Sequence, residues 1–266
     1  MESGLGMNWI QTLAVLRAAK HDEMHIDSCL NKLWQISTNR KKFYKDKFET
    51  DQLGFAYWQN WTFEFENDLH NKIHQALRTG NGLIIGSCFS GYYLPALSLL
   101  KEHNAECMIM QGKSKQGRIS DYLLEDFYKN TGVRLKIASV NTESSFALTK
   151  HLKRNGIAFV MLDMPLQGMT YGIYDFFGYP AIVGDGLYKI ATKTKSSVLP
   201  VYTPRTENGL KIIAGDLQSA DDHEHLISQT LKSLEKLIWT SPSDWWLWDY
   251  LFERWSAAKQ QKLIVG

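Results

Sequence analysis

The chain has 266 residues, 44% of them hydrophobic and 22% charged, and its net charge at pH 7 is +2. These values are ordinary for a soluble globular protein with a sizeable core, and the near-neutral balance argues against nucleic acid as a partner. The three cysteines have no paired spacing, so we expect neither a disulfide framework nor a zinc site, and a reducing compartment fits. No apolar run approaches the length of a transmembrane helix, and a signal-peptide pattern is missing. We therefore expect a cytoplasmic protein, either free or peripheral at the inner face of the membrane.

Residues 1–80 are predicted to form a helical lead-in that packs on the core. The apolar face of residues 8–20, which carries Trp9 and Leu13, either docks on the domain, as we favour, or lies on a membrane surface. Residues 26–78 have a mostly helical pattern that ends at glycines. Five basic residues in this stretch form either a solvated face or a patch for phospholipid headgroups or an acidic carrier protein: Arg40, Lys41, Lys42, Lys45 and Lys47.

From Leu83 onward the pattern alternates between strands and helices. Short apolar runs predict strands at 83–86, 107–110, 135–140, 157–162, 198–202 and 210–214. Amphipathic spacing predicts helices at 92–102, 120–130, 142–154, 186–193 and 222–238, with a glycine-rich segment at 167–178 and a tryptophan-rich close at 243–255. The alternation predicts an α/β fold, a mixed, largely parallel central sheet flanked by helices, over residues 81–266.

Cys88 lies between the first of these strands and the helix that follows. Backbone N–H groups at a helix start favour negative charge, so this position would lower the pKa of a thiol and enrich the thiolate. The alternative is that Cys88 is a small buried hydrophobe, as most free cysteines are. In largely parallel sheets the site lies beyond the carboxyl ends of the strands, where Cys88, Gln111 and Asp163 all fall.

Other constellations carry little chemistry. His70 and His74, and likewise His21 and His25, share a helical face, but neither pair has the glutamate that the zinc-protease pattern requires. The glycines around Cys88 flank the wrong positions for a Gly-x-Ser-x-Gly elbow, and no nucleotide-binding motif occurs. We therefore expect no metal site and no bound cofactor.

Blocks in the second part of the chain carry a family resemblance. The most specific are Phe-Phe-Gly-Tyr-Pro-Ala at 176–181 and a tryptophan-rich close from Pro242 to Trp255, and weaker blocks at 82–94, 152–163 and 198–205 accompany them in the same order. Together they resemble the lysophospholipid acyltransferase superfamily, especially its late lipid A branch, the lauroyl and myristoyl transferases of Gram-negative bacteria. The resemblance covers residues 82–255 and implies an acyltransferase whose donor is an acyl thioester of acyl-carrier protein or coenzyme A.

The catalytic signature of that family, His-x4-Asp/Glu, is replaced here. Cys88 aligns with the histidine that acts as general base, and Tyr93 aligns with the carboxylate that orients it. In the interpretation that we favour, Cys88 attacks the thioester, and the acyl group then passes to an amine, hydroxyl or carrier thiol. The alternative is an inactive relative that binds acyl chains or partner proteins. A third possibility is that a distant base such as His151 serves the site.

The resemblance and the positions of the residues together predict the site. Cys88, Ser90 and Tyr93 form the expected catalytic group. Trp245, Trp246 and Trp248 are expected to pack in the core. Acyl-carrier protein is the expected partner. The expected substrate-binding residues are Ser87, Gly91, Tyr92, Gln111, Asp163, Phe177 and Arg205.

Overall fold

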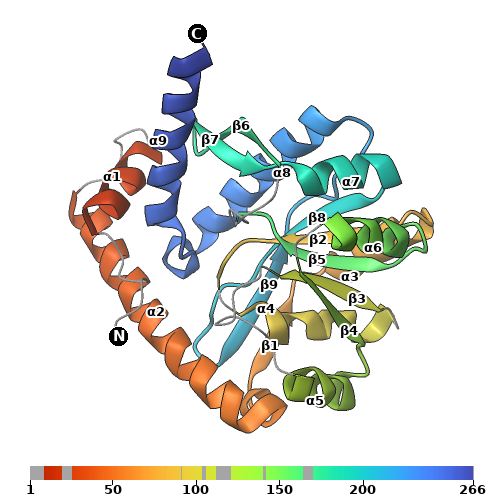
Figure 1. The fold of residues 1–266 in the computed structure, drawn as a ribbon. Coiled ribbons are helices and arrows are strands. Elements are labelled where there is room, and N and C mark those ends of the chain that lie inside the picture. Colours follow the sequence, from red (N-terminus) through yellow and green to blue (C-terminus); the bar gives the residue numbers. More distant parts are fainter. Residues whose placement is uncertain are drawn as a thin grey trace.

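A computed structural model describes residues 9–19, 26–90, 92–103, 106–111, 121–139, 142–163 and 170–265. Its centre is a seven-stranded sheet in the order β1-β9-β8-β2-β5-β3-β4, with helices on both sides (Figure 1). The strands are β1 (Thr62–Phe65), β2 (Leu83–Ser87), β3 (Cys107–Gln111), β4 (Leu135–Ser139), β5 (Ile157–Met161), β8 (Ser197–Tyr202) and β9 (Gly209–Ala214), and a separate hairpin joins β6 (Tyr171–Phe176) to β7 (Tyr179–Gly184).

The helices within the described residues run from the N-terminal lead-in to the end of the chain. The α-helices are α1 (Trp9–Ala19), α2 (Ile26–Leu53), α3 (Leu69–Arg78), α4 (Tyr93–Ala96), α5 (Asp121–Thr131), α6 (Thr142–Leu152), α7 (Gly186–Thr194), α8 (His223–Thr240) and α9 (Trp248–Val265). Short 3₁₀ helices are η1 (Gly54–Trp58), η2 (Leu97–His103) and η4 (Pro242–Asp244).

The sheet is mixed and largely parallel, as predicted. Strand β2 pairs in parallel with both β5 and β8, and β3 pairs in parallel with β4 and β5. Strand β9 pairs antiparallel with β8, and β1 pairs in parallel with β9 at the outer side of the sheet. The sheet thus has five strands whose carboxyl ends meet at one edge, where such folds place their sites.

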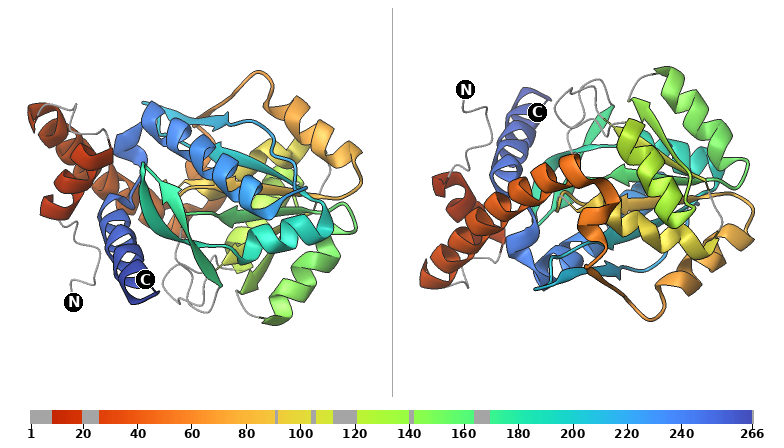
Figure 2. Two further views of the ribbon diagram at one scale, coloured as in Figure 1. Left: turned by 90° about the horizontal axis from the view of Figure 1, so that it is seen from above. Right: turned by 90° about the horizontal axis from the view of Figure 1, so that it is seen from below.

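Two hydrophobic cores cover the two faces of this sheet. Alternate residues of each central strand supply them: Leu83 and Ile85 of β2 belong to one core and Ile84 to the other. Burial on both faces explains why these strands appear in the sequence as continuous apolar runs. The lead-in helices α1 and α2 contribute Leu16 and Leu33 to the same core as Ile84. Figure 2 shows α1 and α9 beside each other at one end of the molecule, and α2 extends from this end across the protein.

Three segments differ from the sequence prediction. The stretch expected to be helical at 26–78 contains strand β1 and the 3₁₀ helix η1. The helix expected at 92–102 is α4, four residues long, continued by the 3₁₀ helix η2. The described part of the glycine-rich segment is mainly strand β6, which reverses at Phe177 and Gly178, both with positive φ as a two-residue hairpin turn requires.

None of the described helices combines the length and apolar character that crossing a bilayer requires.

Candidate active site

Cys88 and Asp163 come together at the carboxyl edge of the sheet. Cys88 directly follows β2, and Asp163 follows β5, its parallel neighbour. The Leu162 N–H donates to the Ser87 carbonyl oxygen at 2.8 Å, which keeps the two chain segments in register just beyond the strands. The parallel pairing of β2 with β5 therefore brings a thiol and a carboxyl group to one place.

The Cys88 side chain is completely buried. Burial, followed by the nearby Asp163 carboxylate, raises the thiol pKa well above its ordinary value. The expected lowering of this pKa is therefore wrong. The physical reason is local: α4 is a single four-residue turn rather than a long helix, so desolvation of the thiolate outweighs any favourable helix field.

Two backbone donors beside Cys88 are already engaged. The Phe89 N–H donates to Asp163 Oδ2 at 2.6 Å, and the Ser90 N–H donates to the Cys88 carbonyl oxygen at 2.8 Å. Neither N–H group is therefore free to stabilise an oxyanion at Cys88. In this arrangement they hold the turn after β2 in place instead.

Asp163 is a buried carboxyl group with one oxygen satisfied and one free. Oδ2 accepts from Phe89 and from the Trp245 indole N–H, each at 2.6 Å, whereas Oδ1 is buried and has no hydrogen-bond partner in the described part of the chain. Burial raises the pKa of Asp163 to about 6, although these hydrogen bonds and Arg254 oppose the shift. Asp163 is thus a stronger base than an exposed aspartate, and its free oxygen lies in the same buried environment as the thiol.

The two serines of the turn make local hydrogen bonds. Ser87 Oγ donates to the Cys88 carbonyl oxygen at 3.3 Å, and Ser90 Oγ lies 2.5 Å from Thr203 Oγ1. Thr203 directly follows β8, and sequence reasoning missed it. The Ser90–Thr203 pair ties the turn after β2 to the end of the neighbouring strand.

Arg205 is held by a buried polar cluster. Its Nη2 lies 3.4 Å from Asp46 Oδ2, and its guanidinium group lies 3.9 Å from the Trp61 ring centroid. The same carboxylate accepts hydrogen bonds from Tyr57 at 2.7 Å and Tyr92 at 3.0 Å. The predicted anion-binding arginine therefore already has a counter-ion, and Tyr92, predicted to bind substrate, is part of the cluster.

Asp46 is the site residue that sequence reasoning missed most clearly. It belongs to α2, far from Arg205 in the chain, and no motif marks it. Its helical spacing from Ile36 and Phe43, which also turn inward, is the one signal that could have placed it on the inner face of α2.

Phe177 packs in an aromatic cluster that belongs to the same buried core as Cys88. Its ring centroid lies 5.5 Å from that of Trp245 and 5.2 Å from that of Trp248, and all three side chains are buried. The core assignment of these tryptophans agrees with this packing. Gly91 and the side chains of Tyr93 and Gln111 lie outside the described residues.

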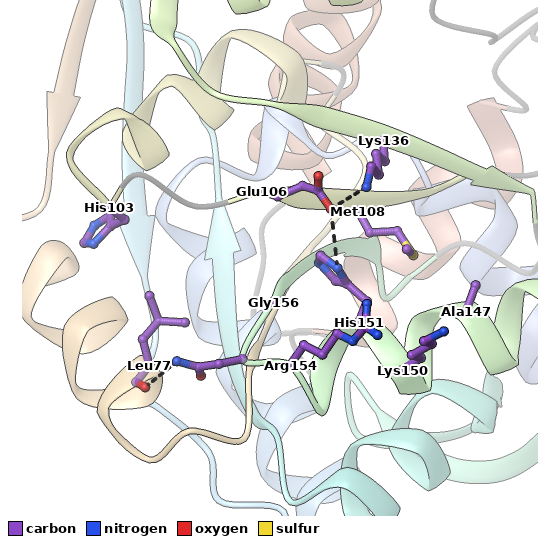
Figure 3. A pocket seen from close by; sticks show the side chains of 11 residues that line it. Leu77, His103, Glu106, Met108, Lys136, Ala147, Lys150, His151, Arg154 and Gly156 are labelled. Atoms are coloured by element: carbon purple, nitrogen blue, oxygen red, sulfur yellow. Dashed lines mark hydrogen bonds and ion pairs between the residues drawn. The ribbon is translucent and has the colours of Figure 1, made fainter.

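His151 lies at the opposite end of the strands, where β5 begins. Its Nε2 is 2.8 Å from the carbonyl oxygen of Ile157, the first residue of β5, so it cannot act as a base at Cys88 beyond the end of the adjacent strand. It lines a pocket of about 590 Å³ together with Glu106, Lys136 and Arg154 (Figure 3). The pocket is open but remote from the thiol and the buried carboxyl group, so we place the candidate chemistry at the carboxyl edge.

One family model matches the chain. It is described as bacterial lipid A biosynthesis acyltransferase and covers residues 59–256, which includes every strand of the sheet and the turns that carry Cys88, Asp163 and Arg205. No curated protein matches the chain.

Proposed function

Because the chain belongs to the bacterial lipid A biosynthesis acyltransferase family, we propose that it transfers an acyl group from an acyl-carrier-protein or coenzyme A thioester to an amine, hydroxyl or carrier thiol. Family membership points to an acyltransferase enzyme. The observation that carries the proposal is that this match spans the strand ends where Cys88 meets Asp163.

Asp163 is the proposed proton acceptor and Cys88 the proposed nucleophile. The thiol proton passes to Asp163 Oδ1 as the sulfur attacks the thioester carbonyl carbon. The donor C–S bond then breaks, and the donor thiolate leaves with the proton from Asp163. A raised carboxyl pKa favours the first transfer, and exchange between thioesters is nearly isoenergetic.

The second half returns the enzyme to its starting state. The acceptor heteroatom attacks acyl-Cys88 while its proton passes to Asp163, and Cys88 leaves as a thiolate that recovers this proton. Ser90, hydrogen-bonded to Thr203, holds the turn after β2 in place. Tyr93 is the third residue of the proposed catalytic group. Because the Cys88 sulfur is buried, the donor reaches it only after the residues that cover it move apart.

Intact mass after incubation with acyl-carrier-protein and coenzyme A thioesters tests the proposal. We expect an acyl adduct on the native protein, none on Cys88→Ala, and a strongly slowed adduct on Asp163→Asn. Cys107→Ala is the matched control because Cys107 is also a buried cysteine with a raised pKa. An adduct that survives in Cys88→Ala, or its loss in Cys107→Ala, contradicts the assignment.

A non-catalytic protein that binds acyl chains or partners is the second candidate. The burial of Cys88 and its raised pKa favour it, because a neutral, covered thiol is a poor nucleophile. Equilibrium binding of a fatty acid or a non-hydrolysable thioether analogue, without adduct or turnover on any thioester donor, would establish this candidate and overturn the first.

A further inference from the structure

Helix α2 has an inner face that packs on the protein and an outer face that carries large apolar side chains. On the inner face, Leu33 and Ile36 are fully buried. On the outer face, Trp34 is 70% exposed, Phe48 63% and Leu30 49%. Large exposed apolar side chains aligned on one element mark an interaction surface more reliably than scattered ones.

Lysines complete this outer face. Five residues lie along one side of the helix because they follow one another at spacings of four, seven, four and three residues. We call this set the α2 stripe: Leu30, Trp34, Lys41, Lys45 and Phe48. Both lysines are exposed. The one acidic residue between Leu30 and Phe48 is Asp46, which turns inward to Arg205. The stripe is therefore apolar and basic without an acidic side chain.

The structure also revises the predicted basic patch. Arg40 turns inward, where it donates to the Trp246 carbonyl oxygen and pairs with Asp249 at 3.3 Å. Lys41 and Lys45 remain on the outer face beside the apolar side chains. The relevant surface is thus a mixed stripe rather than a continuous run of five cations.

We infer that the α2 stripe seats the protein on the surface of an anionic phospholipid bilayer. Leu30 and Phe48 are separated along the helix axis by roughly 27 Å, at about 1.5 Å per residue, so the stripe suits a flat partner. Tryptophan and phenylalanine enter the boundary between headgroups and acyl chains, while lysines pair with anionic headgroups. The apolar side chains of the α2 stripe thus match the acyl-chain boundary of such a bilayer, and its lysines match the negative charge of the headgroups.

The position of α2 connects this surface to the candidate active site. On its inner face, the Phe43 ring lies 5.1 Å from Tyr92 and 4.3 Å from Trp246, beside the turn that follows Cys88. Figure 1 shows α2 along the outside of the molecule, between the α1–α9 end and α5. A protein seated through the α2 stripe therefore holds the carboxyl edge of its sheet close to the bilayer. This inference does not depend on the acyl-transfer chemistry.

Vesicle flotation of the full chain tests the inference. We expect flotation with vesicles of equal parts phosphatidylcholine and phosphatidylglycerol, and little with phosphatidylcholine alone. The double variant Trp34→Ser/Phe48→Ser should weaken binding about tenfold or more, and Lys41→Gln/Lys45→Gln should do so by a similar factor that shrinks at high salt. The exposed positions of these residues predict unchanged thermal unfolding.

Helix α6 offers a matched control. Phe146 is 71% exposed, and Lys150 lies one turn further on the same helix, so Phe146→Ser/Lys150→Gln removes similar groups elsewhere. Equal loss in this control, or no flotation of the native chain, overturns the inference. Two further results would also overturn it. One is a dimer of the native chain, detected by sedimentation, that is absent in Trp34→Ser/Phe48→Ser. The other is binding to acyl-carrier protein that requires the α2 stripe, without binding to vesicles.

Discussion

At the scale of single residues, Asp163 should make stability depend on pH in a specific window. Its pKa is about 6 in the folded protein, against 3.8 for an ordinary aspartate. Between these values the folded state binds more protons than the unfolded state, so the free energy of unfolding falls as the pH rises from about 4 to about 6 and then levels off. The loss is on the order of 3 kcal/mol.

Urea unfolding of the native protein and of Asp163→Asn between about pH 4 and about pH 6 checks whether the free energy of unfolding falls as the pH rises. The amide is neutral, so the variant should lack the slope while keeping acceptors for Phe89 and Trp245. Asp185 is a contrasting control: burial opposes its ionisation, but hydrogen bonds from Lys189 and Thr170 outweigh this and lower its pKa. Its contribution should instead be lost as the pH falls below its ordinary 3.8. A native slope identical to that of Asp163→Asn would contradict the assignment.

Asp46 should contribute more to the free energy of unfolding than a single hydrogen bond does. Replacing it with alanine leaves Arg205, whose side chain is 12% exposed, without its counter-ion and leaves Tyr57 and Tyr92 without an acceptor. We expect Asp46→Ala to cost about 3 kcal/mol or more of unfolding free energy, against about 1 kcal/mol for Tyr57→Phe.

A double-variant cycle separates these effects. Asp46→Ala/Arg205→Met should regain part of the loss, because no buried charge remains unpaired. The pKa of Tyr57, raised to about 12 by burial and then by Asp46, should fall in Asp46→Ala and can be followed by tyrosinate absorbance. Equal destabilisation by Asp46→Ala and Tyr57→Phe would show that the ion pair contributes nothing.

These two residues also show how far a sequence predicts a site. Asp163 was placed at the correct edge because a strand pattern ends just before it, and strand ends are readable. Its proximity to the thiol follows from β2 and β5 being neighbours, which the alternation alone does not specify. Asp46 could not be placed because its partner Arg205 lies across the fold, and no local pattern encodes such a contact.

At the scale of elements, the connection between α3 and β2 requires glycine for two different reasons. Gly80 and Gly82 both have positive φ, at 74° and 76°. A Cβ on Gly80 would meet no atom within 4 Å, whereas one on Gly82 would lie 2.6 Å from the Leu152 carbonyl oxygen and 2.8 Å from that of Gly156. Gly80→Ala should therefore cost about 1–2 kcal/mol from backbone strain alone, and Gly82→Ala distinctly more.

Thermal or urea unfolding of the two variants makes this comparison. The difference between them reports the close approach of the chain after α6 to the start of β2, since the backbone strain is common to both. Similar losses in both variants would show that the neighbouring backbone moves away without cost.

The predictability of an element follows from how its residues are buried. Strands β2, β5 and β8 were found because burial on both faces makes them continuous apolar runs. Strand β1 was missed because it is half-exposed and only four residues long, within an aromatic stretch that also suits a helix. The η2 segment has apolar spacing that also suits an α-helix, and its buried leucines pack in the core as a 3₁₀ helix instead.

At the scale of the whole molecule, the N-terminal helices are bound to the rest of the chain by both apolar and polar contacts. Leu16, Leu33 and Ile36 share a core with β2, α8 and α9. Asp46 pairs with Arg205, and Arg40 pairs with Asp249 of α9. Arg254 of α9 in turn donates to the carbonyl oxygens of Ile182 and Asp163 at 2.6 and 3.1 Å, which joins the β6–β7 hairpin to the candidate site.

These connections predict one cooperative unfolding transition for the whole chain. Removing residues 1–80 would expose the apolar surface beneath α1 and α2 and would delete strand β1 from the sheet edge, so a fragment of residues 81–266 should not fold by itself. Far-ultraviolet circular dichroism and tryptophan fluorescence of the full chain should give coincident transitions, because buried tryptophans lie in both cores. Two separated transitions, or a folded fragment with native-like amide protection, would instead make the lead-in an independent unit, and the ion pairs of Asp46 and Arg40 would then be contacts between domains.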